Sequence, residues 1–129
     1  MKPGKYWIGD LCYVLDEVWD EVCDLIFADE DHMSGEYTLK DGRRFCYSST
    51  MWGDGLYHDQ HGNRYGVDAG LIGAILVEDL PNGPSSLGAV HTFNKEWEMD
   101  VIDKEERRSA WDGVIRFGPL HEEVQIPTD

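Results

Sequence analysis

The sequence predicts an α+β fold that is mostly β: a curved antiparallel sheet or a partly open barrel, with one amphipathic helix packed on it. Two observations support this prediction. Short segments rich in β-branched and aromatic residues recur between Gly- and Pro-containing turns, and a single stretch near residue 20 has the 3.6-residue period of a helix. The 129 residues fit one globular domain, residues 1–129, which can bury a core without disulfide or metal support.

The first strand is expected over residues 6–15, which are rich in aromatic and β-branched side chains. Bulk on both faces of this strand places it in the centre of the sheet, and Gly9 can bend it. Asp16 then predicts a helix N-cap, with the helix running over residues 17–27. At 100° per residue the acidic side chains fall in one arc. The opposite, apolar arc holds Leu15, Val18, Trp19, Val22, Cys23, Leu25 and Ile26.

Two hairpins and a buried strand are expected next. The first hairpin spans residues 36–40 and 43–50 and turns at Asp41-Gly42, with either a three-residue or a two-residue loop. The three-residue loop, with Gly42 left-handed, places Tyr37, Leu39, Phe45 and Tyr47 on one face. The second hairpin spans residues 56–58 and 64–67, and the buried strand spans 71–77. Glycines at 66, 70 and 73 indicate bulges or close backbone approach.

The last third of the chain alternates between strands and turns. Residues 81–86 predict a surface loop, and strands are expected over 88–93, 97–102, 111–117 and 124–126. Residues 103–109 are charged and lack apolar spacing, so we expect a turn or a short exposed helix there. These segments give seven to nine short strands, mostly antiparallel.

The net charge of −15, from 26 acidic and 11 basic residues, favours solubility and restricts the classes of partner. A surface this negative repels nucleic acid and anionic membranes, so we expect direct contact with neither, and a basic protein as the partner. The three cysteines form no C-x-x-C pair, and the sequence shows neither a signal-peptide pattern nor a long apolar run. This combination favours a cytoplasmic location with reduced, buried cysteines.

Eight acidic residues and no Lys or Arg lie between residues 16 and 31. Most of them occupy the polar arc of the expected helix, where like charges four residues apart repel each other. Such a face is often simply solvated, and the functional interpretation is a docking surface for a basic protein. The candidate partner-binding residues are Asp16, Glu17, Asp20, Glu21, Asp24, Asp29, Glu30 and Asp31.

An alternative site is expected in the Gly-, Asp- and His-rich residues 53–70. Carboxylates and imidazoles can bind a divalent metal or act as general acid and base, and nearby arginines can hold the phosphate of a nucleotide-like ligand. The spacing matches no H-E-x-x-H motif, EF-hand or phosphate-binding loop, so no metal or cofactor is predicted, and tight turns select the same residue types. The candidates are Asp54, His58, Asp59, His61, Arg64 and Asp68, to which Asp10 of the first strand can be added.

Residues 7–14, with the motif Gly9-Asp10-Leu11-Cys12-Tyr13, and residues 52–57, 65–74 and 113–118 resemble a group of small uncharacterised proteins of phages and bacteria. Members of that group open with Gly-Asp-Pro-Cys-Tyr, whereas here leucine stands in the proline position, which relaxes a fixed turn. The resemblance implies an intracellular, phage-encoded protein and brings no catalytic activity with it. Small acidic phage proteins are often inhibitors of host enzymes, some by presenting carboxylates where the enzyme expects phosphates.

The leading hypothesis is therefore a non-enzymatic acidic binding protein that inhibits a basic nucleic-acid-handling or defence protein of the host. The alternative is a small-ligand, nucleotide-like binding protein or a metal-assisted hydrolase that uses residues 53–70. A third possibility is an acidic assembly module. The sequence does not determine the oligomeric state.

Overall fold

The computed structural model describes residues 1–28, 34–50, 53–103 and 113–128. The strands are β1 Gly4–Gly9, β2 Ser34–Thr38, β3 Arg44–Ser49, β4 Gly55–His58, β5 Arg64–Val67, β6 Leu71–Leu76, β7 Ala89–Phe93, β8 Asp100–Asp103, β9 Gly113–Phe117 and β10 Val124–Pro127. The helix α1 spans Trp19–Phe27, and three short 3-10 helices are η1 Leu11–Tyr13, η2 Asp16–Val18 and η3 Val77–Asp79. The mostly β, α+β fold expected from the sequence is confirmed, with ten strands in the described residues rather than seven to nine.

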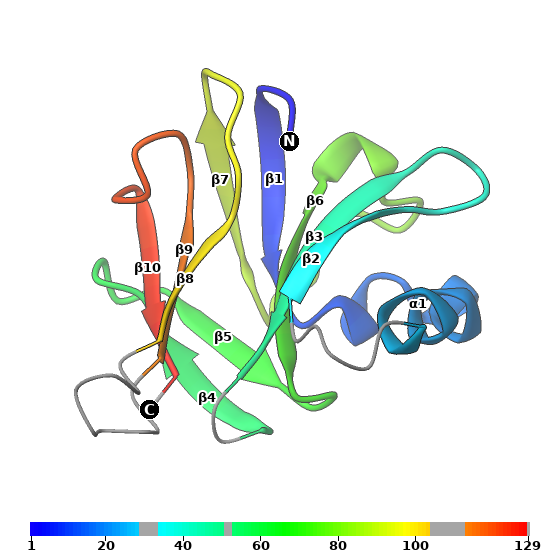
Figure 1. The fold of residues 1–129 in the computed structure, drawn as a ribbon, viewed down its shortest axis with the longest axis horizontal. Helices are drawn as coiled ribbons and strands as arrows, with labels where there is room; N and C mark the ends of the chain where they lie inside the picture. The colour runs from blue at the N-terminus through cyan, green and yellow to red at the C-terminus, as the bar shows by residue number, and fades with distance from the viewer. Residues whose placement is uncertain (29–33, 51–52, 104–112, 129) are drawn as a thin grey trace.

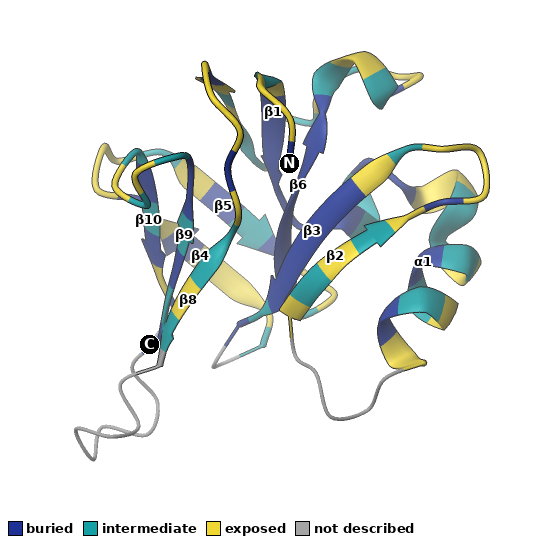
Figure 2. Ribbon diagram, turned by 45° about the horizontal axis from the view of Figure 1, so that its top comes forward, coloured by how far each residue is buried: buried dark blue, intermediate teal, exposed yellow. Residues whose placement is uncertain are grey.

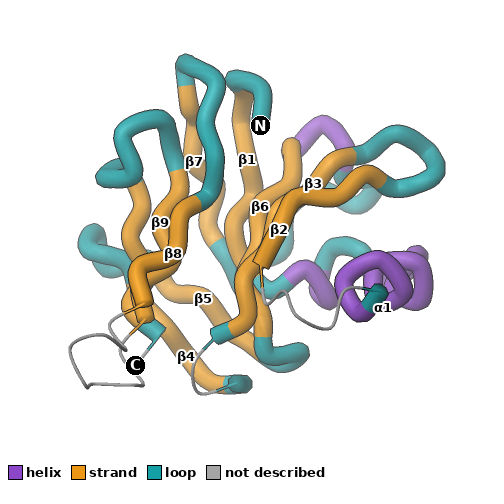
Figure 3. The backbone as a smooth tube through the Cα atoms, viewed as in Figure 1, coloured by secondary structure: helices purple, strands orange, loops and turns teal. Residues whose placement is uncertain are grey.

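The strands form three antiparallel sheets that do not close into a barrel (Figure 1). The largest has the order β2-β3-β6-β1-β7, a second has the order β10-β9-β8, and β4 pairs with β5. The first strand is central as expected, because β1 pairs with both β6 and β7. Strands β2 and β8 each end a sheet, and they flank the open side of the molecule (Figure 3).

The five-stranded sheet is covered on both faces, which explains the uninterrupted apolar runs of β1 and β6. On one face, Tyr6 and Ile8 pack with side chains of β4, β5, β9 and β10. On the other face, Trp7 packs with Leu11, Val22 and Ile26 of η1 and α1. Figure 2 shows these interior ribbons in dark blue. The expected packing of the amphipathic helix on the sheet is therefore confirmed.

The first strand is shorter than expected. The carboxylate of Asp10 accepts hydrogen bonds from the backbone N–H groups of Cys12 at 3.0 Å, Asp68 at 2.8 Å and Ala69 at 2.6 Å. These bonds turn the chain out of the sheet, so Leu11–Tyr13 form η1 instead of continuing β1. Asp16 is not an N-cap either, because it begins the 3-10 turn η2, whose cap Leu15 makes no side-chain hydrogen bond.

The first hairpin has the three-residue loop that places its apolar side chains on one face. Gly42 has φ of 96°, its N–H donates to Leu39 O at 2.9 Å, and the N–H of Leu39 donates to Arg43 O at 2.7 Å. Tyr37 pairs with Phe45 across the strands. Their register confirms the expected shared face. The second hairpin is also confirmed, since β4 and β5 pair from Gly55 opposite Val67 to His58 opposite Arg64.

The buried strand is confirmed, because all six residues of β6 are buried. Gly73 has the expected close approach: a Cβ there would collide with the carbonyl oxygen of Cys46. The strand expected at 97–102 begins only at Asp100. Trp97 instead bonds to the N-terminal residue through its backbone. Its backbone N–H donates to Met1 O at 3.0 Å, and its carbonyl oxygen accepts from the Met1 ammonium at 2.6 Å. Of the residues expected to form a turn or helix at 103–109, Asp103 instead ends β8, and the others, like Trp111, lie outside the described residues.

The loop expected over residues 81–86 is present and extends to residue 88, so β7 begins at Ala89 rather than at residue 88. Strands β9 and β10 lie within the segments expected over 111–117 and near 124–126. Within the part of the chain that the structure describes, no helix has the length and apolar character that crossing a bilayer requires.

Candidate functional site

The acidic residues of η2 and α1 divide into two groups by what they contact. Glu17 and Glu21 point to the β2–β3 loop: Glu17 Oε1 accepts from the Arg43 guanidinium at 3.1 Å, and Glu21 Oε2 accepts from the N–H of Lys40 at 2.6 Å. Asp16, Asp20 and Asp24 are exposed, and none of these three has an ion pair with another described residue. The predicted candidates Asp29, Glu30 and Asp31 lie outside the described residues.

Arg43 ties η2, the turn before α1, to the β2–β3 loop and to η3. Its guanidinium contacts Glu17 at 3.1 Å, Asp41 at 2.8 Å and the carbonyl oxygen of Asp79 at 3.3 Å, so one side chain joins η2, the hairpin loop and η3. Hydrogen bonding to Arg43 lowers the pKa of Asp41. The pKa of Glu17 is lowered by a backbone hydrogen bond of its own and then by Arg43. These two carboxylates are thus ionised, and both pair with Arg43 of the same molecule.

Asp20 and Asp24 share their face of α1 with an exposed phenylalanine, and the exposed Asp16 lies on the preceding turn η2. On α1, Asp20 and Asp24 are four residues apart and Phe27 follows Asp24 by three, spacings that bring side chains together on a helix surface. Phe27 is 69% exposed. We call Asp16, Asp20, Asp24 and Phe27 the aspartate ridge. No Lys or Arg occurs in residues 16–28, so the ridge has no cation of its own helix beside it.

In residues 53–70, the alternative candidate site, the buried carboxylate of Asp59 stabilises a turn. Asp59 Oδ1 accepts from the N–H groups of His61 at 2.8 Å and Asn63 at 3.0 Å, while Oδ2 accepts from Asn63 Nδ2 and the Tyr65 hydroxyl, both at 2.8 Å. Burial alone raises the pKa of Asp59, but these hydrogen bonds outweigh it and the pKa is lowered. With four donors in place, this carboxylate is committed to holding the hairpin turn.

The other candidates of this stretch point in different directions. His58 and Arg64 lie opposite each other on the exposed face of the β4–β5 hairpin, whereas Asp54 and Asp68 are exposed at its other end. His61 Nε2 lies 3.1 Å from Glu123 O. The described residues contain no group of three or more His, Cys, Asp or Glu side chains that could hold a metal ion.

Gln60, which the sequence did not single out, fixes this hairpin to the C-terminal strand. Its side-chain amide donates to Glu122 O at 2.7 Å and Glu123 O at 3.2 Å, and its Oε1 accepts from the N–H of Gln125 at 2.8 Å. A glutamine in a turn is usually solvated, so only the tertiary contact shows its role. The tip of the hairpin is therefore a structural joint.

Asp10 connects most of the segments that carry the family resemblance. It joins the end of β1 to the turn at Asp68 and Ala69, and the neighbouring Gly70 lies against Gly53. The pKa of the Cys12 thiol beside it is raised to about 12, by burial and then by Asp10. Cys12 is thus a protonated thiol at neutral pH and a poor nucleophile.

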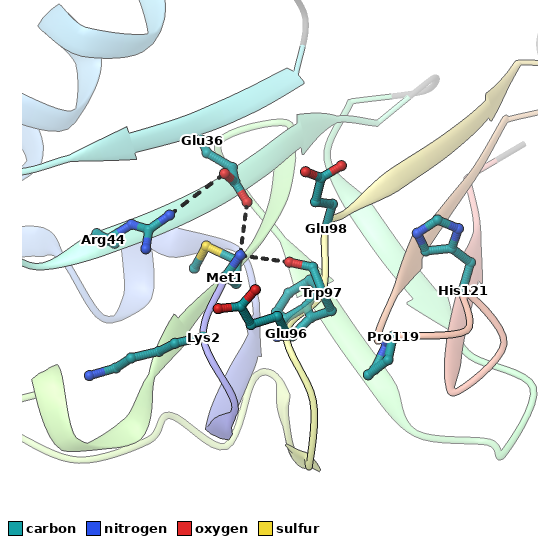
Figure 4. Close-up of a pocket in the computed structure, with 9 residues that line it drawn as sticks. All are labelled: Met1, Lys2, Glu36, Arg44, Glu96, Trp97, Glu98, Pro119 and His121. Atoms are coloured by element: carbon teal, nitrogen blue, oxygen red, sulfur yellow. Dashed lines mark hydrogen bonds and ion pairs between the residues drawn. The ribbon is translucent and has the colours of Figure 1, made fainter.

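A cavity of about 520 Å³ lies on the open side, between β2–β3 and the segment that leads into β8 (Figure 4). Glu36 on its wall accepts from the Met1 ammonium at 3.4 Å and pairs with Arg44 at 3.8 Å. The wall carries both signs of charge, so charge does not define a ligand class for it. Arg44 is one of the arginines that the sequence suggested for a phosphate, and the other lining residues were not predicted; the full lining is Met1, Lys2, Glu36, Arg44, Glu96, Trp97, Glu98, Pro119 and His121.

Comparisons of the chain with models of protein families, with curated proteins and with solved structures found no match. The resemblance to small phage and bacterial proteins stays a prediction. The aspartate ridge and the net charge of −15 are the features of the molecule that bear on a partner.

Proposed function

We propose that this protein is a non-enzymatic binding protein that docks on a basic protein through the aspartate ridge and blocks the surface it covers. The observation that carries the proposal is the exposed pair Asp20 and Asp24 beside Phe27 on α1, with Asp16 exposed on the preceding turn η2, while Glu17 and Glu21 bond to the β2–β3 loop. Exposed carboxylates steer a basic partner, and an exposed aromatic ring supplies the apolar contact that anchors an interface.

A nucleic-acid-handling enzyme or defence protein of the host is the partner class that fits this surface. Residues four apart on a helix are separated by about 6 Å along its axis, and nucleotides in one DNA strand by about 3.4 Å. The axial spacing of Asp20 and Asp24 on α1 is therefore close to that of every second phosphate of one strand along the duplex axis. The net charge of −15 supports the same partner, since it raises the rate of encounter with a basic surface.

The test combines affinity purification with matched charge reversals. Tagged protein is used to capture partners from nuclease-treated bacterial lysate at low and high salt, and the captured protein is then purified and titrated. We expect the pair Asp20→Lys and Asp24→Lys to weaken binding by about 100-fold and Phe27→Ala by about tenfold. The control pair Asp54→Lys and Asp68→Lys changes the net charge equally and should retain most of the affinity.

Equal weakening by both pairs would show that net charge, and not the ridge, drives binding. A partner whose affinity is unchanged by the ridge substitutions would contradict the proposal. Inhibition is measured separately, as the partner's activity on nucleic acid with and without the protein. The alternative ligand-binding or hydrolase function has no comparable support, because the side chains of residues 53–70 do not converge.

A further inference from the structure

A chain of three polar side chains, two buried and one half-buried, links the edge strand β7 to the β4–β5 hairpin. The hydroxyl oxygen of Tyr65, on β5, lies 2.8 Å from Asp59 Oδ2 and 2.9 Å from His91 Nε2. Tyr65 is fully buried, the carboxylate of Asp59 is inaccessible, and the side chain of His91 is 16% exposed. None of these side chains belongs to the aspartate ridge.

The protons in this chain can be assigned from the donor and acceptor properties of its groups. An ionised carboxylate only accepts, so the Tyr65 hydroxyl donates to Asp59. The Tyr65 oxygen must then accept from His91, which requires a hydrogen on Nε2. Neutral His91 keeps its lone pair on Nδ1. A further proton binds to Nδ1 and places a positive charge between β7 and the β4–β5 hairpin.

The groups around His91 act on that charge in opposite directions. Asp59 Oδ2, 3.8 Å from His91 Nε2, favours the imidazolium, while His61 of the same turn opposes it. The β1 residue opposite is Tyr6, and Phe93 of the same strand stacks on the imidazole at 6.5 Å, so neither adds a charge. Burial has the largest effect, and the pKa of His91 is lowered.

Few other hydrogen bonds of the described residues hold the β4–β5 hairpin to β7 and the loop before it. Apart from the side-chain chain, the described backbone link is the bond from Gly66 N–H to Leu87 O at 3.0 Å. In contrast, β7 is held to β1 by a ladder that runs from Gly4 opposite Phe93 to Ile8 opposite Ala89. Opening this contact therefore breaks few hydrogen bonds and leaves the large sheet paired, although it also separates Tyr65 from Phe93, which pack in the same core.

We propose that the His91–Tyr65–Asp59 chain is an acid-sensitive latch, in which protonation of His91 releases the β4–β5 hairpin from β7 without unfolding the five-stranded sheet. Because the folded pKa of His91 lies below its unfolded value, the latch contributes fully above about pH 6.5. Its contribution is lost as the pH falls from there towards the lower folded pKa.

Hydrogen exchange measured by mass spectrometry, corrected for the intrinsic rate, tests the latch at about pH 7.5 and about pH 5.0. In the wild-type protein, we expect protection of residues 55–67 to fall at the lower pH, because the folded pKa of His91 is lowered, with β3 and β6 unaffected. His91→Gln keeps a side-chain donor and cannot ionise, so it should abolish this response. The matched control His58→Gln, on the exposed face of the same hairpin, should retain it.

Two results would overturn the latch. One is an acid response of the His91→Gln protein equal to that of the wild type. The other is a loss of protection spread evenly over all strands, which indicates global unfolding. If His91→Gln does not fold, NMR titration of the wild-type imidazole decides the question, because a His91 pKa at or above 6.5 rules the latch out.

Discussion

Asp10 is fully buried, and three backbone N–H groups donate to its carboxylate. Those donors belong to η1 and to the turn after β5, so one side chain determines where β1 ends and where the second hairpin meets the sheet. Buried polar groups need such partners, because an unsatisfied donor loses its hydration and gains nothing in return. The carboxylate is thus a buried structural element bonded to the backbone.

Replacing Asp10 by Asn should destabilise the protein by about 1–3 kcal/mol, because one acceptor oxygen becomes an NH₂ group facing backbone donors. Urea unfolding followed by tryptophan fluorescence measures the change. Asp68→Asn is the matched control, since the Asp68 side chain is exposed and its stability effect should stay within about 0.5 kcal/mol. Equal stabilities for the two variants would contradict the role of Asp10.

At the residue scale, the sequence could indicate which residue types matter but not how each is used. Asp59 and Asp10 were both candidates for chemistry, and both turned out to bind backbone N–H groups. The turn role of Asp59 was foreseeable, because its bonds reach only residues 61–65. The contacts of Asp10 with Asp68 and of Gln60 with Gln125 span about half of the chain, and no local pattern encodes them.

The β2–β3 hairpin is the element whose geometry depends most clearly on one glycine. Gly42 has φ of 96°, a left-handed conformation in which a β-carbon is strained, although the space around it is empty. The loop carries Lys40, Asp41 and Arg43, which hold η2 and α1. A change at Gly42 therefore acts on the helix as well as on the turn.

Gly42→Ala should destabilise the protein by about 1 kcal/mol through backbone strain, and Gly42→Asn by less, because asparagine tolerates this conformation. Chemical denaturation of the three proteins checks the order glycine, asparagine, alanine. A Gly42→Ala protein as stable as the wild type would mean that the loop can change its conformation. In that case the anchoring of the helix by Arg43 should be examined first.

At the element scale, the period of the apolar residues predicts which elements form, but it does not predict where they begin and end. The helix was recognisable because its apolar residues form one arc, and Val22 and Ile26 are buried as that arc requires. The end of β1 and the start of β8 were misplaced, since they depend on Asp10 meeting Asp68 and on Met1 pairing with Trp97. Both contacts join residues more than fifty positions apart, which a local pattern does not record.

The charge of −15 is a property of the whole molecule and acts on its stability as well as on its partners. Like charges spread over a small fold repel each other, and salt screens that repulsion over a distance that shrinks from about 30 Å to about 8 Å between 0.01 M and 0.15 M. Stability should therefore depend on ionic strength even without a partner.

Raising NaCl from about 0.01 M to about 0.3 M should increase Tm by about 4 °C, which corresponds to roughly 1 kcal/mol for a domain of this size. Differential scanning calorimetry measures the change. A triple variant, Asp16→Asn, Asp20→Asn and Asp24→Asn, carries less charge and should show a smaller increase. A Tm that falls or stays constant with salt would show that repulsion is not a significant term.

The central position of β1 also determines when, during synthesis, the five-stranded sheet can begin to fold. Trp7 pairs with Ile75 on one side and Val90 on the other, so neither neighbour exists when β1 leaves the ribosome. At 5–20 residues per second, residue 90 follows residue 7 by roughly 4 to 17 s. During that interval the nascent chain exposes Trp7 and Ile8, the residues that later form the middle of its core. Translation, rather than strand pairing, therefore sets the earliest moment at which this sheet can assemble.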